Sequence, residues 1–227
     1  MSDPDHNESS RRLPNPALIL GLAVLTAVLG IVDAVLVARR WPPLMELDKT
    51  VDGSLHRIGE SDPWFVDPAY VFHWLGTPVV VTPIIVVVVL GLAIFRHFGW
   101  AAMIAACAIL GVIVSETVKH LVDRPRPEWS DPFVVETGGS FPSGHSMVGV
   151  YGWAMFGVAA LYLLPRAWAC WIGWPLIIFG LLFAPSRLVL GVHWPSDVVG
   201  GWLLGAAVAL SVSGVAILIA RRQLPRQ

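Results

Sequence analysis

The chain has 227 residues, of which 56% are hydrophobic and only 14% are charged. Soluble domains carry about 25% charged residues, so this composition argues against a water-soluble fold and favours a lipid environment. The formal net charge of −1 offers no basic surface for nucleic acid, and the length fits one domain.

Apolar runs of spanning length dominate the chain, since a bilayer helix takes about 20 such residues. They cover about residues 17–38, 70–95, 99–118, 146–164, 168–184 and 197–220. The polar tail before them, residues 1–14, is predicted to be disordered, and residues 15–227 are predicted to form one domain. The pattern therefore predicts an all-α fold, a six-transmembrane helix bundle.

The segment between the first two spans, residues 42–67, is much more polar than the spans themselves. Its apolar residues recur with a helical period, which is typical of a helix that lies in the membrane surface. We therefore expect an interfacial amphipathic helix between the first two spans.

Charged, histidine and serine residues gather in three clusters at the ends of predicted spans. Residues 119–127 leave the third span, residues 141–145 enter the fourth, and residues 186–197 enter the sixth. Because successive spans alternate in direction, all three clusters are expected at the same end of the bundle. Cations and histidines gathered in a chain so poor in charge indicate a functional site.

The order and spacing of these clusters resemble the type 2 phosphatidic acid phosphatase superfamily. Its pattern is Lys, six residues, Arg-Pro; then Pro-Ser-Gly-His; then Ser-Arg, five residues, His, three residues, Asp. The chain matches every position, at Lys119, Arg126, Pro127, Pro142, Ser143, Gly144, His145, Ser186, Arg187, His193 and Asp197. The resemblance covers roughly residues 70–220 and implies a membrane phosphatase that forms a phosphohistidine.

Five motif residues are assigned by the resemblance to phosphate binding. A phosphoryl group in transfer carries spread negative charge, so catalysis rests mainly on positioning and charge stabilisation. Lys119, Arg126 and Arg187 would supply cations, and the arginine fork matches phosphate oxygens. Ser143 can cap a helix that begins at Gly144, where backbone N–H groups would point at an anion.

Two histidines and one aspartate carry the bond-making steps that the resemblance implies. His193 attacks phosphorus as neutral imidazole, and His145 protonates the leaving oxygen and later activates water. Asp197, four residues after His193, would accept from the other ring nitrogen and fix the tautomer. Pro195 fits only the first turn of a helix, so His193 is expected at or just before the helix start. No carboxylate cluster indicates a metal, and we expect neither metal nor cofactor.

Several charged residues near the motifs carry no assigned role. Lys119 has an alternative partner in Glu116, one turn earlier in the predicted helix. His56 and His73 are expected to line loops on the motif side. The roles left open are those of Asp33, His120 and Arg124.

The function that these features predict is hydrolysis of a lipid phosphate or of an isoprenyl, undecaprenyl-type pyrophosphate. Phosphatidate and phosphatidylglycerol phosphate are the other candidate substrates. A lipid phosphotransferase would use the same phosphohistidine with an alcohol as acceptor, and a transporter or scaffold is the non-enzymatic alternative. Vanadate-dependent haloperoxidases share the site pattern but are soluble. Head group, phosphate number and oligomeric state are left open by the sequence.

The placement of lysine and arginine sets the predicted orientation in the membrane. Six spans put both termini on one side, which carries the arginines at positions 11, 12, 96, 166, 221, 222 and 226. The other side carries fewer cations once Lys119, Arg126 and Arg187 are assigned to the site. Arg39 and Arg40 lie on that other side and argue for the opposite orientation. We predict a multi-pass protein of the cell (plasma) membrane with cytoplasmic termini and an extracytoplasmic active site.

Overall fold

The computed structural model describes residues 14–223, and the regular elements in that range are all helical. They are α1 (Pro16–Ala38), α2 (Pro42–Ser61), α3 (Pro63–Gly76), α4 (Pro78–Ile94), α5 (Phe98–Val122), α6 (Gly144–Val148), the π-helical stretch η1 (Gly149–Ala154), α7 (Met155–Leu163), α8 (Arg166–Val189) and α9 (Pro195–Gln223). The predicted all-α class is confirmed. The predicted disordered tail, apart from its last residue, lies outside the described residues.

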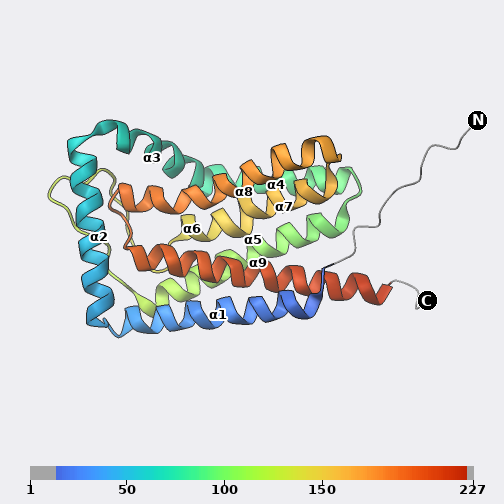
Figure 1. Cartoon of the computed structure of the whole chain (residues 1–227), viewed down its shortest axis with the longest axis horizontal. Helices are drawn as coiled ribbons and strands as arrows, with labels where there is room; N and C mark the ends of the chain where they lie inside the picture. The colour runs from blue at the N-terminus through green and yellow to red at the C-terminus, as the bar shows by residue number, and fades with distance from the viewer. Residues whose placement is uncertain (1–13, 224–227) are drawn as a thin grey trace, which may run out of the picture.

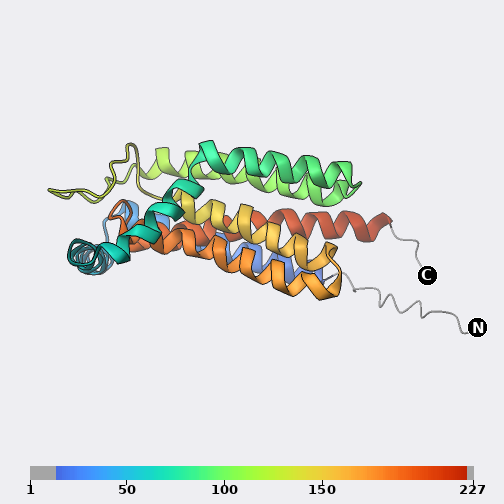
Figure 2. The same cartoon turned by 90° about the horizontal axis from the view of Figure 1, so that it is seen from above.

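The helices form an elongated bundle with α2 laid across one end (Figure 1). α1 packs along α9, α8 packs against η1 and α7, and α4 packs against α5. Seen from above, α4 and α5 form one edge of the bundle, and α8 lies toward the opposite edge (Figure 2). α2 sits at the end where α1 stops and α9 begins, far from the start of α1.

Within residues 14–223, five helical stretches are long and apolar enough to cross a membrane: α1, α5, Gly144–Leu163, α8 and α9. Trp64–Gly76 and Pro78–Ile94, which meet at a bend of 57°, pass the same test together and make a sixth candidate span if they are taken as one. The outer surface is apolar as well, for example at Leu18 and Val24 of α1, which are 63% and 64% exposed. Such a surface suits lipid, and the predicted six-span bundle is confirmed with its second span in two pieces.

Proline breaks two segments that the apolar pattern predicts as continuous helices. The predicted second span, residues 70–95, is interrupted at Thr77, directly before Pro78. The predicted interfacial helix, residues 42–67, ends at Ser61, two residues before Pro63. In both places a residue before proline adopts extended backbone, because the proline ring disfavours helical geometry there.

Two helices extend further toward the α2 end than the hydropathy pattern predicts. α5 continues to Val122 and therefore carries Lys119 in its last turn. α8 continues to Val189, so Ser186 and Arg187 belong to its last turns and not to the entry of the sixth span, which corrects that prediction. Burial explains the extension, because the polar side chain of Arg187 is fully buried among protein groups rather than exposed to lipid.

Glycine pairs bring α8 into backbone contact with the stretch from α6 to α7. A Cβ added at Gly149 would collide with the carbonyl oxygen of Gly180, and one at Gly157 would collide with that of Gly173. This close approach places His145 beside Phe183, with ring centroids 6.5 Å apart and Arg187 one turn further along α8. Helix packing thus sets the distance between two of the motif clusters.

Candidate active site

The three motif clusters meet at the end of the bundle that α2 crosses (Figure 1). The loop between α5 and α6, the start of α6, and the turn between α8 and α9 all lie there. The predicted convergence of the clusters at one end therefore agrees with the structure.

His193 lies in the turn just before α9, which begins at Pro195 as the sequence predicts. Its side chain is 2% exposed, its Nδ1 lies 3.4 Å from Asp197 Oδ2, and its Nε2 lies 3.1 Å from an Arg126 nitrogen. Arg126 can only donate, so Nε2 is the acceptor and carries the free electron pair. Burial, together with the charges of Arg187 and Arg126, lowers the pKa of His193 well below its usual range, and the imidazole is neutral at neutral pH.

Arg126 and Arg187 converge on one carboxylate, that of Glu136 in the loop between α5 and α6. Arg126 lies 3.0 Å from Glu136 Oε2, and Arg187 pairs directly with Oε1. Burial alone would raise the pKa of Glu136, but the charges of Arg187 and Arg126 and the hydrogen bond from Arg187 lower it to about 2. The pair of guanidinium groups beside His193 is therefore an anion-binding cradle, and Glu136 occupies it in this structure.

His145 stands in the first turn of α6, and its Nε2 lies 3.0 Å from the carbonyl oxygen of His73. This carbonyl can only accept, so the proton sits on Nε2 and the other ring nitrogen carries the electron pair. The imidazoles of His73 and His145 stack with centroids 5.7 Å apart, and His73 Nδ1 accepts from Arg187. The second motif histidine is thus coupled to the cradle through His73 and Arg187.

Ser143 and Gly144 begin α6 as predicted. The Ser143 hydroxyl caps the helix by accepting from the Ser146 N–H at 3.4 Å, and the Ser143 N–H donates to the Asp197 carbonyl at 3.0 Å. Lys119 Nζ lies 3.8 Å from the position that a Cβ at Gly144 would take. It also pairs with Glu116 at 3.2 Å, the alternative partner that the sequence offers.

Sequence reasoning missed two groups of the site, His73 and Glu136. His73 was expected to line a loop, but it lies on α3, where the helix reaches Arg187. No pattern in the sequence ties it to the motifs. Glu136 does leave a signal, because it is the single acidic residue between Asp131 and Asp197.

The residues with open roles fall into different environments. His120 is exposed on α5, away from the cradle contacts. Asp33 has its Oδ2 buried without a hydrogen-bond partner among residues 14–223, close to Gly200 of α9. Arg124 is buried and bonded to Asp197. Within the described range, no group of three or more His, Cys, Asp and Glu side chains is arranged to hold a metal ion.

Comparisons with known proteins agree with the motif pattern. The sequence model of the PAP2 superfamily matches residues 100–217. An undecaprenyl-diphosphatase of Sulfolobus acidocaldarius is 32% identical over 106 residues, which cover 44% of this chain and 48% of the relative. Phosphatidylglycerophosphatase B of Bacillus subtilis is 28% identical over 166 residues, which cover 67% of this chain and 75% of the relative. The chain thus spans about half the length of the first relative and three quarters of the second.

A solved structure shares the fold. The crystal structure of a transmembrane PAP2 type phosphatidylglycerolphosphate phosphatase from Bacillus subtilis has a TM-score of 0.77 with this chain at 22% identity, covering 90% of this chain and 98% of that one. At this identity the likeness establishes the fold. The superfamily match extends over more than half of the sequence and includes all three motifs, and the chain belongs to the PAP2 superfamily.

Proposed function

We propose that the chain is an integral membrane phosphatase that hydrolyses a lipid phosphate or an isoprenyl pyrophosphate through a phosphohistidine on His193, without a metal ion. The observation that carries the proposal is the neutral imidazole of His193, whose Nε2 faces Arg126 at 3.1 Å beside the cradle of two arginines. A nucleophile with a free electron pair next to an anion-binding site is what phosphoryl transfer needs.

In the first half-reaction, His193 Nε2 attacks phosphorus, the N–P bond forms and the bond from phosphorus to the lipid oxygen breaks. Asp197 accepts the Nδ1 proton of His193 in a hydrogen bond and stabilises the positive charge that develops on the ring. When the anionic substrate binds, His145 takes up a second proton on the ring nitrogen that does not face the His73 carbonyl, and it gives that proton to the departing oxygen. Lys119, Arg126 and Arg187, with the Ser143 hydroxyl and the Gly144 N–H, hold the phosphoryl oxygens.

In the second half-reaction, water attacks the phosphohistidine. His145, left without its proton, accepts one from the water, the N–P bond breaks, and inorganic phosphate leaves with His193 restored as neutral imidazole. No metal ion takes part in either step, because the cations of the cradle supply the charge stabilisation.

The substrate class follows from where the site lies. The cradle is at the end of an apolar bundle, beside α2, which we infer to lie in the membrane surface. The phosphate of a bilayer lipid would be at that depth, with its tails already among the spans. The names of the two relatives, an undecaprenyl-diphosphatase and a phosphatidylglycerophosphatase, support a lipid substrate.

We further infer that the chain is a multi-pass protein of the cell membrane, with the end that carries the motif loops and α2 facing outward.

Phosphate release by the purified protein in detergent tests the proposal. We expect turnover of phosphatidate, phosphatidylglycerol phosphate or undecaprenyl pyrophosphate, with kcat/KM far above that for glucose 6-phosphate and unchanged by excess EDTA. The matched control is His193→Gln, which should be inactive yet fold and express normally. Equal cleavage of glucose 6-phosphate would contradict the lipid assignment, and strict dependence on magnesium would contradict the metal-free mechanism.

A further inference from the structure

A buried ionic cluster lies behind the His193–Asp197 pair, on the side away from the cradle. Its centre is the guanidinium of Arg124, which donates to Asp197 Oδ1 at 2.6 Å, to Ser196 Oγ at 2.7 Å and to Asp48 Oδ2 at 2.6 Å. Asp48 and Asp197 are fully buried, and Arg124 is 7% exposed. One cation thus joins a carboxylate of α2 to the aspartate that faces His193.

Asp48 also forms hydrogen bonds directly with the start of α9. Its Oδ1 accepts the Ser196 backbone N–H at 2.9 Å, and its Oδ2 accepts the Ser196 hydroxyl at 2.6 Å. A carboxylate that accepts from the first turn of a helix satisfies backbone N–H groups that the helix itself leaves unpaired. α2 therefore supplies a cap for the helix that begins two residues after His193.

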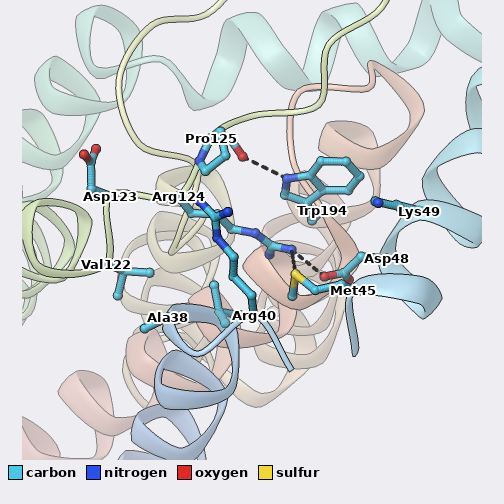
Figure 3. Close-up of a pocket in the computed structure, with 11 residues that line it drawn as sticks. Ala38, Arg40, Met45, Asp48, Lys49, Val122, Asp123, Arg124, Pro125 and Trp194 are labelled. Carbon is cyan, nitrogen blue, oxygen red and sulfur yellow. Dashed lines mark hydrogen bonds and ion pairs between the residues drawn. The ribbon is translucent and has the colours of Figure 1, made fainter. Parts of the chain in front are cut away.

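Figure 3 shows Arg124 and Asp48, the two members of the cluster that line a cavity of 340 Å³ between α1, α2 and the end of α5. Arg124 reaches across the view toward Asp48 and Met45, and the indole of Trp194 bonds the carbonyl of Pro125 at 2.9 Å. The residue that follows His193 is thereby bonded to the residue that follows Arg124.

The two oxygens of Asp197 have separate partners. Oδ1 is taken by Arg124, whereas Oδ2 faces the Trp194 N–H at 2.9 Å and His193 Nδ1 at 3.4 Å. With Oδ1 fixed, the carboxylate cannot rotate away from the imidazole. A buried ion pair adds little net stability compared with apolar packing, so its main effect here is on geometry.

We propose that Arg124 and Asp48 are positioning residues that hold Asp197 toward His193, which makes α2 a working part of the phosphatase and not merely a membrane-surface helix. This inference rests on the proposed function of His193. It assigns a role to Arg124, which the sequence left open, and to Asp48, which no motif includes.

Asp48→Asn is the first test, because it removes one negative charge and leaves Arg124 paired with Asp197. We expect kcat to fall roughly ten- to hundredfold while KM stays within about twofold.

Arg124→Lys, which keeps the charge but loses the fork, should retain more activity than Arg124→Gln. The matched control is Asp52→Asn, one turn further along α2, which is equally buried and has no hydrogen-bond partner for either carboxylate oxygen within residues 14–223. Below pH 7 Asp52 holds its proton and is as uncharged as asparagine, so kcat of this variant measured there should equal that of the wild type.

Two further measurements separate positioning from a merely structural role. In an Asp197→Asn background, adding Asp48→Asn should lower kcat by no more than about twofold, because the group through which it acts is already lost. Nitrogen NMR of labelled histidine, with the His193 signals assigned by His193→Gln, should show Nδ1–H in the wild type and a mixture of tautomers in Asp48→Asn.

The outcomes are distinct. A wild-type kcat together with a wild-type tautomer in Asp48→Asn would overturn the inference. It would also be overturned if Asp48→Asn lowered kcat as much in the Asp197→Asn background as it does in the wild type. Should the wild-type protein release no phosphate from any lipid, the proposed function fails, and the tautomer of His193 alone then decides whether α2 positions it.

Discussion

Glu136 sets the electrostatic balance of the cradle at the level of single residues. Its carboxylate pairs with Arg126 and Arg187, and so occupies hydrogen-bond donors that a phosphoryl group would need. A substrate phosphate has to displace it or share these donors. Each ligand that binds here therefore competes with an anion that belongs to the protein itself.

Replacing Glu136 by Gln should strengthen inhibition by orthovanadate about five- to tenfold, since the competing charge is removed while both arginines stay. The inhibition constant of vanadate against phosphate release measures this. Glu128→Gln, at an exposed position in the same loop, is the control and should change nothing. Weaker inhibition in Glu136→Gln would show that the carboxylate supports the anion site instead of competing for it.

The depressed pKa of His193 has a consequence for the pH profile. A histidine whose pKa is lowered stays neutral, and hence nucleophilic, as the pH falls through its usual value of about 6.5. The acid limb of kcat/KM, corrected for ionisation of the substrate, should therefore begin well below pH 6.5. Because the Arg187 charge contributes to the shift, Arg187→Gln should move that limb toward higher pH. A wild-type limb at or above pH 6.5 would contradict the assignment.

At the scale of elements, the face of α2 that packs against the rest of the protein is acidic. Asp48 and Asp52 are four residues apart and both fully buried, whereas Lys49 and Arg57 are exposed. Asp48 is paired with Arg124, but neither oxygen of Asp52 has a hydrogen-bond partner within residues 14–223. Burial, with Asp197 and Asp48 nearby, raises the pKa of Asp52 to about 7.

This raised pKa predicts that Asp52→Asn stabilises the protein in a pH-dependent way. The folded protein holds the proton more tightly than the unfolded chain, so the cost of ionising Asp52 appears as the pH rises from about 4 through 7. Thermal unfolding in detergent should give a gain on the order of a few degrees at pH 8 and almost none at pH 4. A gain of equal size at both pH values would mean that packing, not charge, is responsible.

The sequence predicted helices well and their ends poorly. Apolar runs define where spans exist, because lipid tolerates few charges, but α8 carries Arg187 past the end of its apolar run through contacts that only folding creates. The break at Pro78 was readable from the proline itself. The motif residues were predictable because their spacing is local to three segments. Asp48 was not predictable, since its partner Arg124 lies 76 residues away in the chain. Glu136 stands alone as an acidic residue between Asp131 and Asp197, but its contact with Arg187, 51 residues away, is created only by folding.

At the scale of the whole molecule, the bundle has two distinct ends. The motif loops and α2 lie at one end, and the turn between α4 and α5 lies at the other (Figure 1). The lysine and arginine distribution in the sequence predicts that the first end is extracytoplasmic. This predicted orientation would decide which leaflet supplies the proposed lipid substrate.

Cysteine labelling in intact cells tests the orientation. In a Cys170→Ser background, which removes the exposed native thiol and leaves the buried Cys107, we expect Ser130→Cys to react with an impermeant reagent. His97→Cys, in the α4–α5 turn, should react only after the cells are permeabilised. The reverse pattern would turn the active site toward the cytoplasm without affecting the proposed chemistry.

Trapping the covalent intermediate tests the central claim most directly. After rapid quenching of the purified enzyme with a lipid substrate labelled in its phosphate, the protein should carry label that is stable to alkali and lost in acid, as a phosphohistidine is, and the labelled peptide should contain His193. His145→Ala should gain the label more slowly than the wild type and also lose it more slowly, because both formation and hydrolysis of the intermediate use this histidine. Turnover by the wild type with no labelled protein at any quench time, or undiminished label in His193→Gln, would contradict the account.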